Sequence, residues 1–217
     1  MTVFELTHTI QNQMPVYPGT EPPQLTTACT IAQCGYQETL LHMYSHVGTH
    51  MDAPAHMIAG GATVDSYPPE RFMGRAWVLD CRGQREIGLP LLLEQREQIE
   101  RAEFLLFCTG WDRYWGSEDY YRGFPCLTEE AARYVAGLGL KGVGEDSISL
   151  DPCDTTDFPI HHILLGAGLV NTENLKGLDR LAGRECFFLT LPLKYENADG
   201  CCCRAAAVIA GTEAAEG

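Results

Sequence analysis

The strongest constraint on the fold of this 217-residue chain is an alternation of apolar, strand-like runs with helical patterns that begins near residue 75. Such an alternation favours a mixed or parallel sheet, because helices then cover the faces of the sheet. Strands are predicted near 2–6, 25–32, 38–46, 75–80, 103–108, 141–144, 168–172, 184–191 and 204–210. The sequence therefore predicts a protein of the α/β class.

Three helices are predicted between these strands. One covers residues 90–101, and another covers residues 128–138, where Thr128 can cap the N-terminus and acidic residues follow it. A third helix is expected to begin at Asp157 and to run through Leu165.

Composition and charge narrow the class of protein. The chain is 45% hydrophobic, which is enough for a buried core, and its length predicts one domain over residues 1–217. The 15 Lys+Arg and 29 Asp+Glu give a formal charge of −14, which argues against nucleic acid as a partner because phosphates require clustered basic side chains. No apolar run approaches the roughly 18 residues of a membrane span, and no signal peptide is evident. A cytoplasmic protein is expected.

Ten cysteines do not predict a disulfide framework, because a chain of this length does not need such cross-links. No two cysteines have the C-x-x-C spacing, which argues against a structural zinc ribbon. We expect reduced and mostly buried thiols. The triplet Cys201-Cys202-Cys203 has no evident role in the sequence.

Histidines cluster in one short segment. His42, His46, His50 and His56 account for four of the seven histidines. Asp52 lies among them, and imidazole nitrogen together with carboxylate oxygen suits a divalent metal. Two histidines and one carboxylate leave coordination positions open, as a catalytic metal requires. We therefore predict a metal site here, in preference to scattered surface histidines.

Two backbone conformations could bring these side chains together. On a helix His46 and His50 would share a face, but Gly48 and a nearby proline weaken a helix, and the H-E-x-x-H motif is absent. In an extended chain His46, His50 and Asp52 have equal parity and share a face. A strand that ends near His46 and continues into a glycine-containing loop is therefore favoured. Residues 47–74 do not follow the alternation of strands and helices. A segment of this length without regular structure inside a compact domain is usually functional.

A second candidate group lies far downstream and consists of His161, His162 and Glu173. Adjacent helical residues point about 100° apart, so at most one of the two histidines can face a given site. A solvated histidine pair and a loop glutamate remain the alternative at this point.

The segment His46-x-Gly48-Thr49-His50-x-Asp52-x-Pro54-x-His56 closely resembles the signature of the cyclase family of metal-dependent hydrolases. That family includes bacterial kynurenine formamidase and isatin hydrolase. Weaker similarities follow in the family's order over nearly the whole chain, at residues 14–19, 61–80, 109–112, 144–147, 151 and 164–175.

The resemblance implies a swivelling β/β/α-type single domain with a mixed sheet flanked by helices, which assembles as a homodimer or larger oligomer such as a tetramer. The residues that it implies as metal ligands are His46, His50, Asp52, His161 and Glu173, with Asp52 shared between two metals. His56 would be the catalytic acid/base, and Tyr17 would line the substrate pocket. Zinc is expected, manganese is the alternative, and one or two ions per subunit are open.

The residues and the implied class together predict hydrolysis of a small-molecule amide, either an N-formyl arylamine or a cyclic amide, by metal-activated water. His56 would take the proton from the water and give it to the leaving nitrogen.

Two departures from the family concern specificity. Formamidases usually have Trp where Tyr17 stands, and the family segment Asp-Gly-Ser-Pro-x-Arg is replaced at residues 199–204 by one with three cysteines.

Three other functions stay open on the sequence alone. One is hydrolysis of a cyclic ester or lactone, and another is a non-catalytic metal-binding or interaction protein on the same fold. The third is a thiol hydrolase with Cys108 or the triplet at residues 201–203 as nucleophile, which would need an electropositive and partly exposed thiol. A chelator would abolish the activity of a metal enzyme, and alkylation would abolish that of a thiol enzyme.

Overall fold

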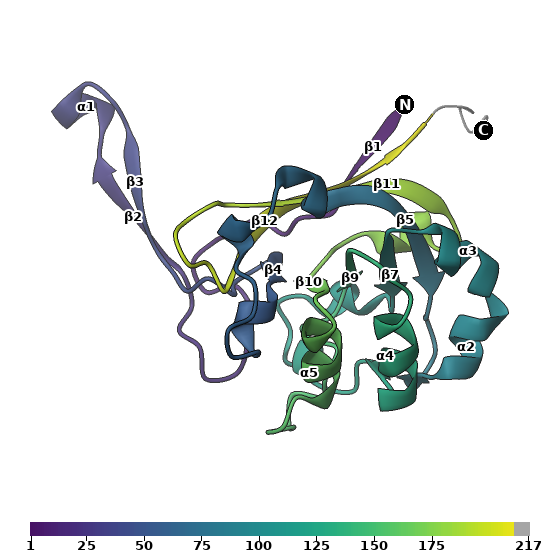
Figure 1. The fold of residues 1–217 in the computed structure, drawn as a ribbon. Helices are drawn as coiled ribbons and strands as arrows, with labels where there is room; N and C mark the ends of the chain where they lie inside the picture. Colours follow the sequence, from purple (N-terminus) through teal and green to yellow (C-terminus); the bar gives the residue numbers. More distant parts are fainter. Residues whose placement is uncertain (211–217) are drawn as a thin grey trace.

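Eight strands form one mixed sheet in the computed structural model, which describes residues 1–210 (Figure 1). The order of the strands is β1-β12-β11-β5-β7-β9-β10-β4. Their bounds are β1 (Thr2–Glu5), β4 (His50–Asp52), β5 (Met73–Asp80), β7 (Phe104–Cys108), β9 (Gly142–Glu145), β10 (Val170–Glu173), β11 (Glu185–Pro192) and β12 (Gly200–Ile209). The neighbours β5, β7, β9 and β10 are parallel, whereas β1, β4, β11 and β12 pair antiparallel. Because β4 pairs with both β10 and β12, the sheet closes into a barrel-like arrangement.

Helices lie beside the parallel strands (Figure 1). They are α2 (Leu89–Glu94), α3 (Arg96–Arg101), α4 (Glu129–Ala136) and α5 (Pro159–Gly166), and a small parallel pair of strands, β6 (Glu86–Ile87) and β8 (Cys126–Leu127), joins the loops near them. Thr128 caps α4 as predicted, since its side chain accepts a hydrogen bond from the Ala131 N–H. The predicted α/β class, with a mixed sheet flanked by helices, is therefore confirmed. None of the helices in residues 1–210 is long and apolar enough to cross a bilayer.

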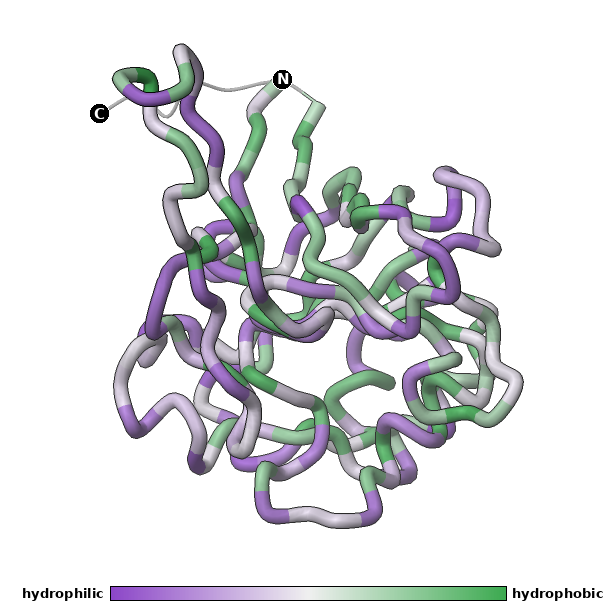
Figure 2. The backbone as a smooth tube through the Cα atoms, turned by 90° about the vertical axis from the view of Figure 1, so that its left-hand side faces the viewer, coloured by the Kyte–Doolittle hydropathy of each residue, from purple (hydrophilic) through white to green (hydrophobic). Residues whose placement is uncertain are grey.

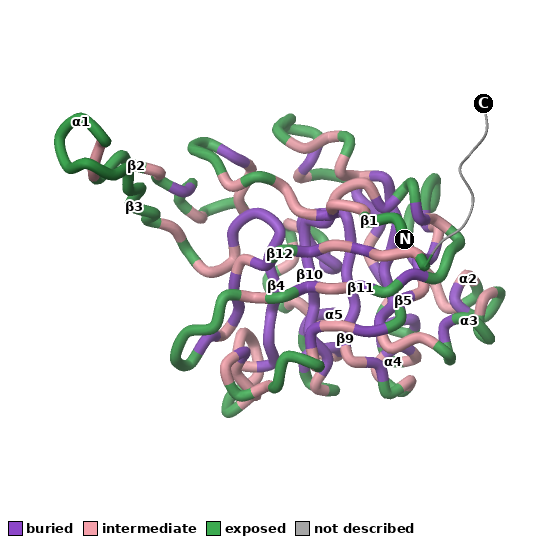
Figure 3. Tube along the Cα trace, turned by 90° about the horizontal axis from the view of Figure 1, so that it is seen from above, coloured by how far each residue is buried: buried purple, intermediate pink, exposed green. Residues whose placement is uncertain are grey.

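The central parallel strand β7 is apolar throughout because both of its faces are buried. In β7, Phe104 and Leu106 pack with residues of β4, β11 and β12, whereas Leu105 and Phe107 pack with residues of α3, α4 and α5. Successive strand residues point to opposite faces, so one strand supports two hydrophobic cores. Figure 3 shows the resulting run of buried residues along the central strands.

A second, separate sheet projects from the body as an arm, which we define as residues 24–42. It consists of β2 (Gln24–Cys29) and β3 (Glu38–His42), joined by the short helix α1 (Ile31–Cys34). The arm extends to the upper left in Figure 1, and Figure 2 shows it again at the upper left. The two predicted strands are shorter than expected, because α1 replaces the end of the first and the second ends at His42.

The segment at residues 47–74 is more regular than predicted. It contains β4 and three short 3-10 turns, at Pro54–His56, Val64–Ser66 and Pro69–Phe72. β4 has only three residues, which is too short for an alternating pattern to be visible in the sequence. Its place in the sheet depends on pairing with two distant strands.

Two predicted helices also differ from the observed ones. Residues 90–101 form two helices instead of one, because Gln95 leaves the helical conformation (φ −120°, ψ 26°). α5 begins at Pro159 and not at Asp157, because Phe158 has a left-handed backbone conformation (φ 44°) that is not compatible with a right-handed helix.

Candidate functional site

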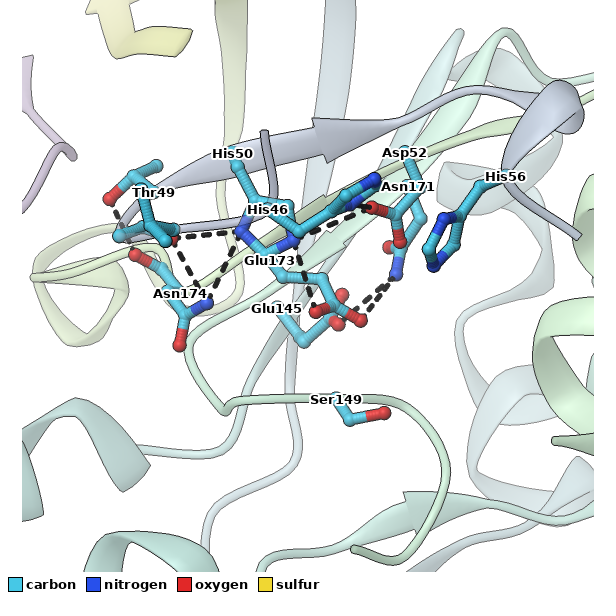
Figure 4. Close-up of polar contacts among 12 residues, drawn as sticks. His46, Thr49, His50, Asp52, His56, Glu145, Ser149, Asn171, Glu173 and Asn174 are labelled. Atoms are coloured by element: carbon cyan, nitrogen blue, oxygen red, sulfur yellow. Dashed lines mark hydrogen bonds and ion pairs between the residues drawn. The ribbon is translucent and has the colours of Figure 1, made fainter. Parts of the chain in front are cut away.

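The histidine-rich segment brings three predicted metal-binding residues together. β4 places His50 and Asp52 on one face, since alternate residues of a strand point the same way. His46 comes from a loop, because β3 ends at His42 and not near His46, and the chain turns at Gly48 (φ 63°). His46 Nδ1 lies 2.6 Å from Asp52 Oδ1, and His50 Nε2 lies 3.4 Å from the same oxygen (Figure 4).

His161 and Glu173, from the downstream group, lie next to the same cluster. Glu173 ends β10 directly opposite His50 in the strand register, and His161 lies in α5. His161 Nε2 is 3.0 Å from Glu173 Oε1 and 3.6 Å from Asp52 Oδ2. His50 Nε2 is 3.5 Å from Glu173 Oε2. His162 is exposed, so one histidine of the adjacent pair faces the site, as expected from helix geometry.

Two of the imidazoles are oriented by contacts on their far nitrogens. His50 Nδ1 lies 2.9 Å from the Gly48 carbonyl oxygen, and His161 Nδ1 lies 2.7 Å from Asp151 Oδ2. The Asp151 carboxylate is itself fixed, because it accepts hydrogen bonds from the backbone N–H groups of Ile160 and His161. A proton held on Nδ1 leaves the Nε2 lone pair free to bind a cation. Both Nε2 atoms point into the cluster.

Asp199 completes the cluster and was missed by the sequence reasoning. Its Oδ2 lies 2.9 Å from His46 Nε2 and 3.6 Å from His56 Nδ1. The rings of His46 and His56 are in contact, with 3.9 Å between their centroids. Asp199 precedes β12, and the pairing of Gly200 with Asp52 brings it to the site. The only signal in the sequence was its place in the segment that resembles the family's Asp-Gly-Ser-Pro-x-Arg.

The neutral side chains of Asn171 and Asn174 restrain the cluster through hydrogen bonds. The amide nitrogen of Asn171 donates to Glu173 Oε1 at 3.1 Å and to Glu145 Oε1 at 3.3 Å. The Asn174 amide donates to the Gly48 carbonyl at 3.0 Å and accepts a hydrogen bond from the buried Tyr120 hydroxyl at 2.7 Å. These contacts restrain both the loop at Gly48 and the Glu173 side chain. They come from four different parts of the chain, so no local pattern predicted them.

Burial and close opposite charges set the protonation of the cluster. Burial lowers the pKa of His46, but the Asp52 carboxylate outweighs this and raises the pKa to about 9. Burial alone would raise the pKa of Asp52, yet the charge on His46 and hydrogen bonds from His161 and His46 hold it well below its usual range. Burial also opposes the charge on His161, but its hydrogen bond with Asp151 raises that pKa well above the usual value. The carboxylates therefore favour positive charge at this point.

The donor set fits one or two divalent cations. Three groups of side chains each bring donor atoms within 4.8 Å of one another: His46–His50–Asp52, Asp52–His161–Glu173 and His46–His56–Asp199. The first two groups share Asp52, which has two carboxylate oxygens to offer. Buried carboxylates need a cationic partner, and mixed imidazole and carboxylate donors suit zinc and manganese. The structure thus brings all five predicted ligands together, and their role as ligands stays a prediction.

The cluster lies in the wall of a cavity of about 460 Å³ that Tyr17 also lines, and the contact of Tyr17 with a substrate stays a prediction. The Tyr17 ring is 6.4 Å from that of Phe158, which in turn is 6.2 Å from the His161 ring. Phe158 is a bulky residue with a positive φ, a strained conformation that often accompanies function. Two aromatic side chains beside the imidazoles suit a planar, largely apolar ligand.

The thiols considered as nucleophiles are not activated. Burial raises the pKa of Cys202 to about 11 and that of Cys203 to about 12, and it also raises that of Cys108. Cys202 donates to the Val47 carbonyl at 3.2 Å, and Cys203 accepts a hydrogen bond from the Thr190 hydroxyl at the same distance. A nucleophilic thiol needs a lowered pKa. The thiol hydrolase is therefore disfavoured, and the triplet takes a packing role in β12.

Comparison with known proteins identifies the family. Residues 4–152 match the model of the Cyclase family, described as "Putative cyclase". The chain belongs to this family. The kynurenine formamidase of Salinibacter ruber is 30% identical over 207 residues, which are 94% of this chain and 96% of that relative. The predicted family membership is thus confirmed.

Solved structures of cyclase-family type agree over nearly the whole chain. Isatin hydrolase A from Ralstonia solanacearum matches with a TM-score of 0.81 and 26% identity, over 95% of this chain and 91% of that chain. A Bacillus stearothermophilus protein described as a "predicted metal-dependent hydrolase" matches with a TM-score of 0.79 and 28% identity, over 95% of this chain and 97% of that chain. The similarity therefore extends well beyond the histidine motif.

Proposed function

We propose that this cyclase-family protein is a metal-dependent hydrolase that cleaves an amide bond in a small molecule, either an N-formyl arylamine or a cyclic amide. The observation that carries the proposal is the convergence of three histidines and two carboxylates in the wall of an aromatic-lined cavity. The similarity to proteins named kynurenine formamidase and isatin hydrolase supports the reaction type. Hydrolysis of a cyclic ester or lactone is the catalytic alternative.

The residues that would hold the metal are His46, His50 and Asp52, with a second position formed by Asp52, His161 and Glu173. A bound divalent cation lowers the pKa of its water toward about 7 and polarises a carbonyl oxygen. We expect zinc, with manganese as the alternative, and one or two ions per subunit, because both metals accept imidazole and carboxylate donors.

His56 is the proposed acid/base. Its ring contacts that of His46, but the two donor groups around Asp52 are complete without it. Burial lowers its pKa, so the ring is neutral near pH 7 and can accept a proton. Asp199 lies 3.6 Å from His56 Nδ1 and would stabilise the protonated ring until the proton passes to the leaving nitrogen. Tyr17 would contact the substrate beside it.

We also propose that residues 1–217 form one domain and that the protein acts in the cytoplasm as a homodimer or larger oligomer. One closed sheet that draws strands from both halves of the chain supports the single domain. A small molecule is the expected partner, because the cavity is enclosed by the aromatic and imidazole side chains described above. Nucleic acid is not expected, given the net charge of −14.

The test is metal quantification followed by a panel of N-formyl amides, cyclic amides and lactones. We expect bound zinc or manganese, turnover of at least one amide class, and loss of that turnover in a chelator but not after thiol alkylation. Rapid turnover of N-formylkynurenine would show that Tyr17 does not exclude this substrate. A fully metallated protein that hydrolyses no member of the panel would favour the non-catalytic metal-binding alternative.

A further inference from the structure

A series of buried hydrogen bonds runs from the His50 ring into the interior of the protein. His50 Nδ1 lies 2.9 Å from the Gly48 carbonyl oxygen, and the Asn174 amide nitrogen lies 3.0 Å from the same oxygen. The Asn174 amide oxygen accepts a hydrogen bond from the Tyr120 hydroxyl at 2.7 Å. His50, Asn174 and Tyr120 are each at most 5% exposed. We refer to these four residues as the relay.

The relay has one consistent direction of donors and acceptors. A carbonyl oxygen only accepts, so the Gly48 oxygen requires a proton on His50 Nδ1 and the nitrogen of the Asn174 amide. A reversed amide would place the Asn174 oxygen against the Gly48 oxygen. With its proton on Nδ1, His50 keeps a lone pair on Nε2, which lies 3.4 Å from Asp52 Oδ1. The relay therefore favours the tautomer of His50 that can bind a cation.

The backbone holds the Asn174 amide in this place. Asn174 has a left-handed conformation (φ 57°), which asparagine tolerates better than most residues. Its N–H donates to the Ser147 carbonyl at 3.0 Å, and its own carbonyl accepts a hydrogen bond from the Thr49 hydroxyl at 2.6 Å. Figure 4 shows the amide beside the His50 ring. The position of the amide is thus fixed by contacts with two other parts of the chain.

Tyr120 is the inner end of the relay. It lies in the 3-10 turn Glu118–Tyr121, and its ring meets that of Trp115 edge to face, with 5.1 Å between the centroids. Burial raises the pKa of Tyr120 well above its usual value, so the hydroxyl keeps its proton and donates it to Asn174. A buried hydroxyl is costly without a partner, and this one has found its partner beside the metal cluster.

We propose that Tyr120 and Asn174 are positioning residues that fix His50 for metal binding through the Gly48 carbonyl. The inference rests on the proposed function in that it takes His50 as a metal ligand. Groups that orient a metal-bound imidazole from its far nitrogen typically contribute about 10–100-fold to metal affinity. If Tyr120 only packs the aromatic residues around it, the loss of its hydroxyl leaves metal affinity unchanged.

The first test is Tyr120→Phe, which removes one hydroxyl and keeps the ring. We expect its affinity for zinc to fall by about 10–100-fold, measured by competition with a chromophoric chelator, with circular dichroism to show that the protein is folded. The matched control is Tyr134→Phe. The Tyr134 hydroxyl is also buried, but it has no hydrogen-bond partner among residues 1–210, so the control should bind zinc like wild type.

A double-mutant cycle tests whether Tyr120 acts through Asn174. Asn174→Gly removes the amide and keeps the left-handed backbone, which glycine adopts readily. We expect a loss of zinc affinity at least as large as in Tyr120→Phe. The double variant Tyr120→Phe/Asn174→Gly should lose no more than Asn174→Gly alone, because the hydroxyl then has no amide to hold. Losses that multiply in the double variant would contradict the relay.

The tautomer of His50 gives a readout that does not need metal. In the metal-free protein, at a pH where the ring is neutral, imidazole ¹⁵N chemical shifts should show the proton on Nδ1 in wild type and a mixture of both tautomers in Tyr120→Phe and Asn174→Gly. Unchanged shifts and unchanged zinc affinity in both variants, or an equal loss in Tyr134→Phe, would overturn the proposal. A wild-type protein that binds neither zinc nor manganese would refute the proposed function, and the tautomer of His50 would still test the relay.

Discussion

His56 differs from the other site histidines in how its surroundings act on it. The strong contacts of His46 and His161 are with carboxylates, which favour the charged imidazole, whereas His56 is half-buried and its nearest carboxylate oxygen is 3.6 Å away. Even partial burial, without a close ion pair to oppose it, lowers the pKa of the His56 imidazole. A neutral ring next to a metal site suits proton transfer better than permanent charge.

We expect His56→Ala to lower kcat by about 10²–10⁴-fold, the usual contribution of a positioned proton-transfer group. Metal content should stay at the wild-type level, because the donor groups around Asp52 remain complete. Steady-state kinetics and metal analysis of the same preparation measure both. His162→Ala, in an exposed position, is the matched control and should behave like wild type. Loss of metal from His56→Ala would make His56 a ligand and refute the acid/base role.

Asp52 is the residue on which both proposed metal positions depend. Asp52→Ala should remove metal and activity together, since it takes one carboxylate from two donor groups at once. Metal analysis after dialysis, with circular dichroism to show that the chain is folded, checks this expectation. The control is Asp157→Ala, which changes an exposed aspartate two residues before α5. An Asp52→Ala protein with full metal and full activity is incompatible with the site.

At the scale of elements, a buried aspartate ties the end of β9 to the loop after β7. Asp146 Oδ1 accepts hydrogen bonds from the Thr109 N–H and hydroxyl, and its Oδ2 accepts one from the Gly110 N–H. All three partners are protein groups that lie away from water. The carboxylate thereby holds two adjacent strand ends together at the edge where the site is built.

Asp146→Ala would leave two backbone N–H groups buried without acceptors, at a cost of about 1–3 kcal/mol each. We therefore expect the free energy of unfolding to fall by about 2–6 kcal/mol in urea denaturation. Asp157→Ala should change it by less than about 0.5 kcal/mol, as is usual for an exposed position. Equal stability of Asp146→Ala and wild type would show that the loop does not depend on this carboxylate.

The same residue gives a pH dependence with a definite sign. Burial outweighs the hydrogen bonds and raises the pKa of Asp146 to about 6. Between about pH 4 and pH 6 the native chain therefore holds a proton that the unfolded chain has lost, and the contribution of Asp146 to stability falls as the pH rises through this window. The stability difference between wild type and Asp146→Ala should thus be about 1 kcal/mol larger at pH 5 than at pH 7. A difference that grows with pH would contradict the raised pKa.

At the scale of the whole molecule, the site concentrates negative charge where the two ends of the sheet meet. Asp52 in β4 and Glu173 in β10 lie in strands that close the barrel, and Asp199 directly precedes a third, β12. A cation at their meeting point would therefore stabilise the closure as well as provide chemistry. Metal binding and global stability should be coupled in this protein.

Removal of metal with a chelator should lower the melting temperature by about 5–10 °C. A ligand present at about 100 times its dissociation constant contributes about 2.7 kcal/mol, and each kcal/mol shifts the melting temperature of a chain of this length by about 2–4 °C. Differential scanning calorimetry with and without chelator, followed by re-addition of zinc or manganese, measures the shift. The Asp52→Ala chain should not respond to re-addition. Identical melting with and without metal would argue against a cation that bridges the closing strands.

Much of the fold could be predicted from the sequence, because the patterns that identify a strand or a helix lie within that element. β7 is a continuous apolar run since both of its faces are buried, and α4 begins with a capping threonine. The predicted bounds of two helices were wrong, because the backbone leaves the right-handed helical conformation at a single residue, Gln95 in one case and Phe158 in the other. β4 was not predicted, because three residues contain too little pattern and its pairing partners lie more than a hundred residues away.

The sequence by itself determined the family, the mixed α/β class and the first half of the site, because His46, His50 and Asp52 lie within seven residues of one another. Only the tertiary structure decided that His161 and Glu173 face the same point and that Asp199 joins them. It also decided that the arm has no cover within the described chain. The reason is that spacing along a chain constrains neighbours within one element, whereas contact between distant elements depends on how the strands pair to close the sheet.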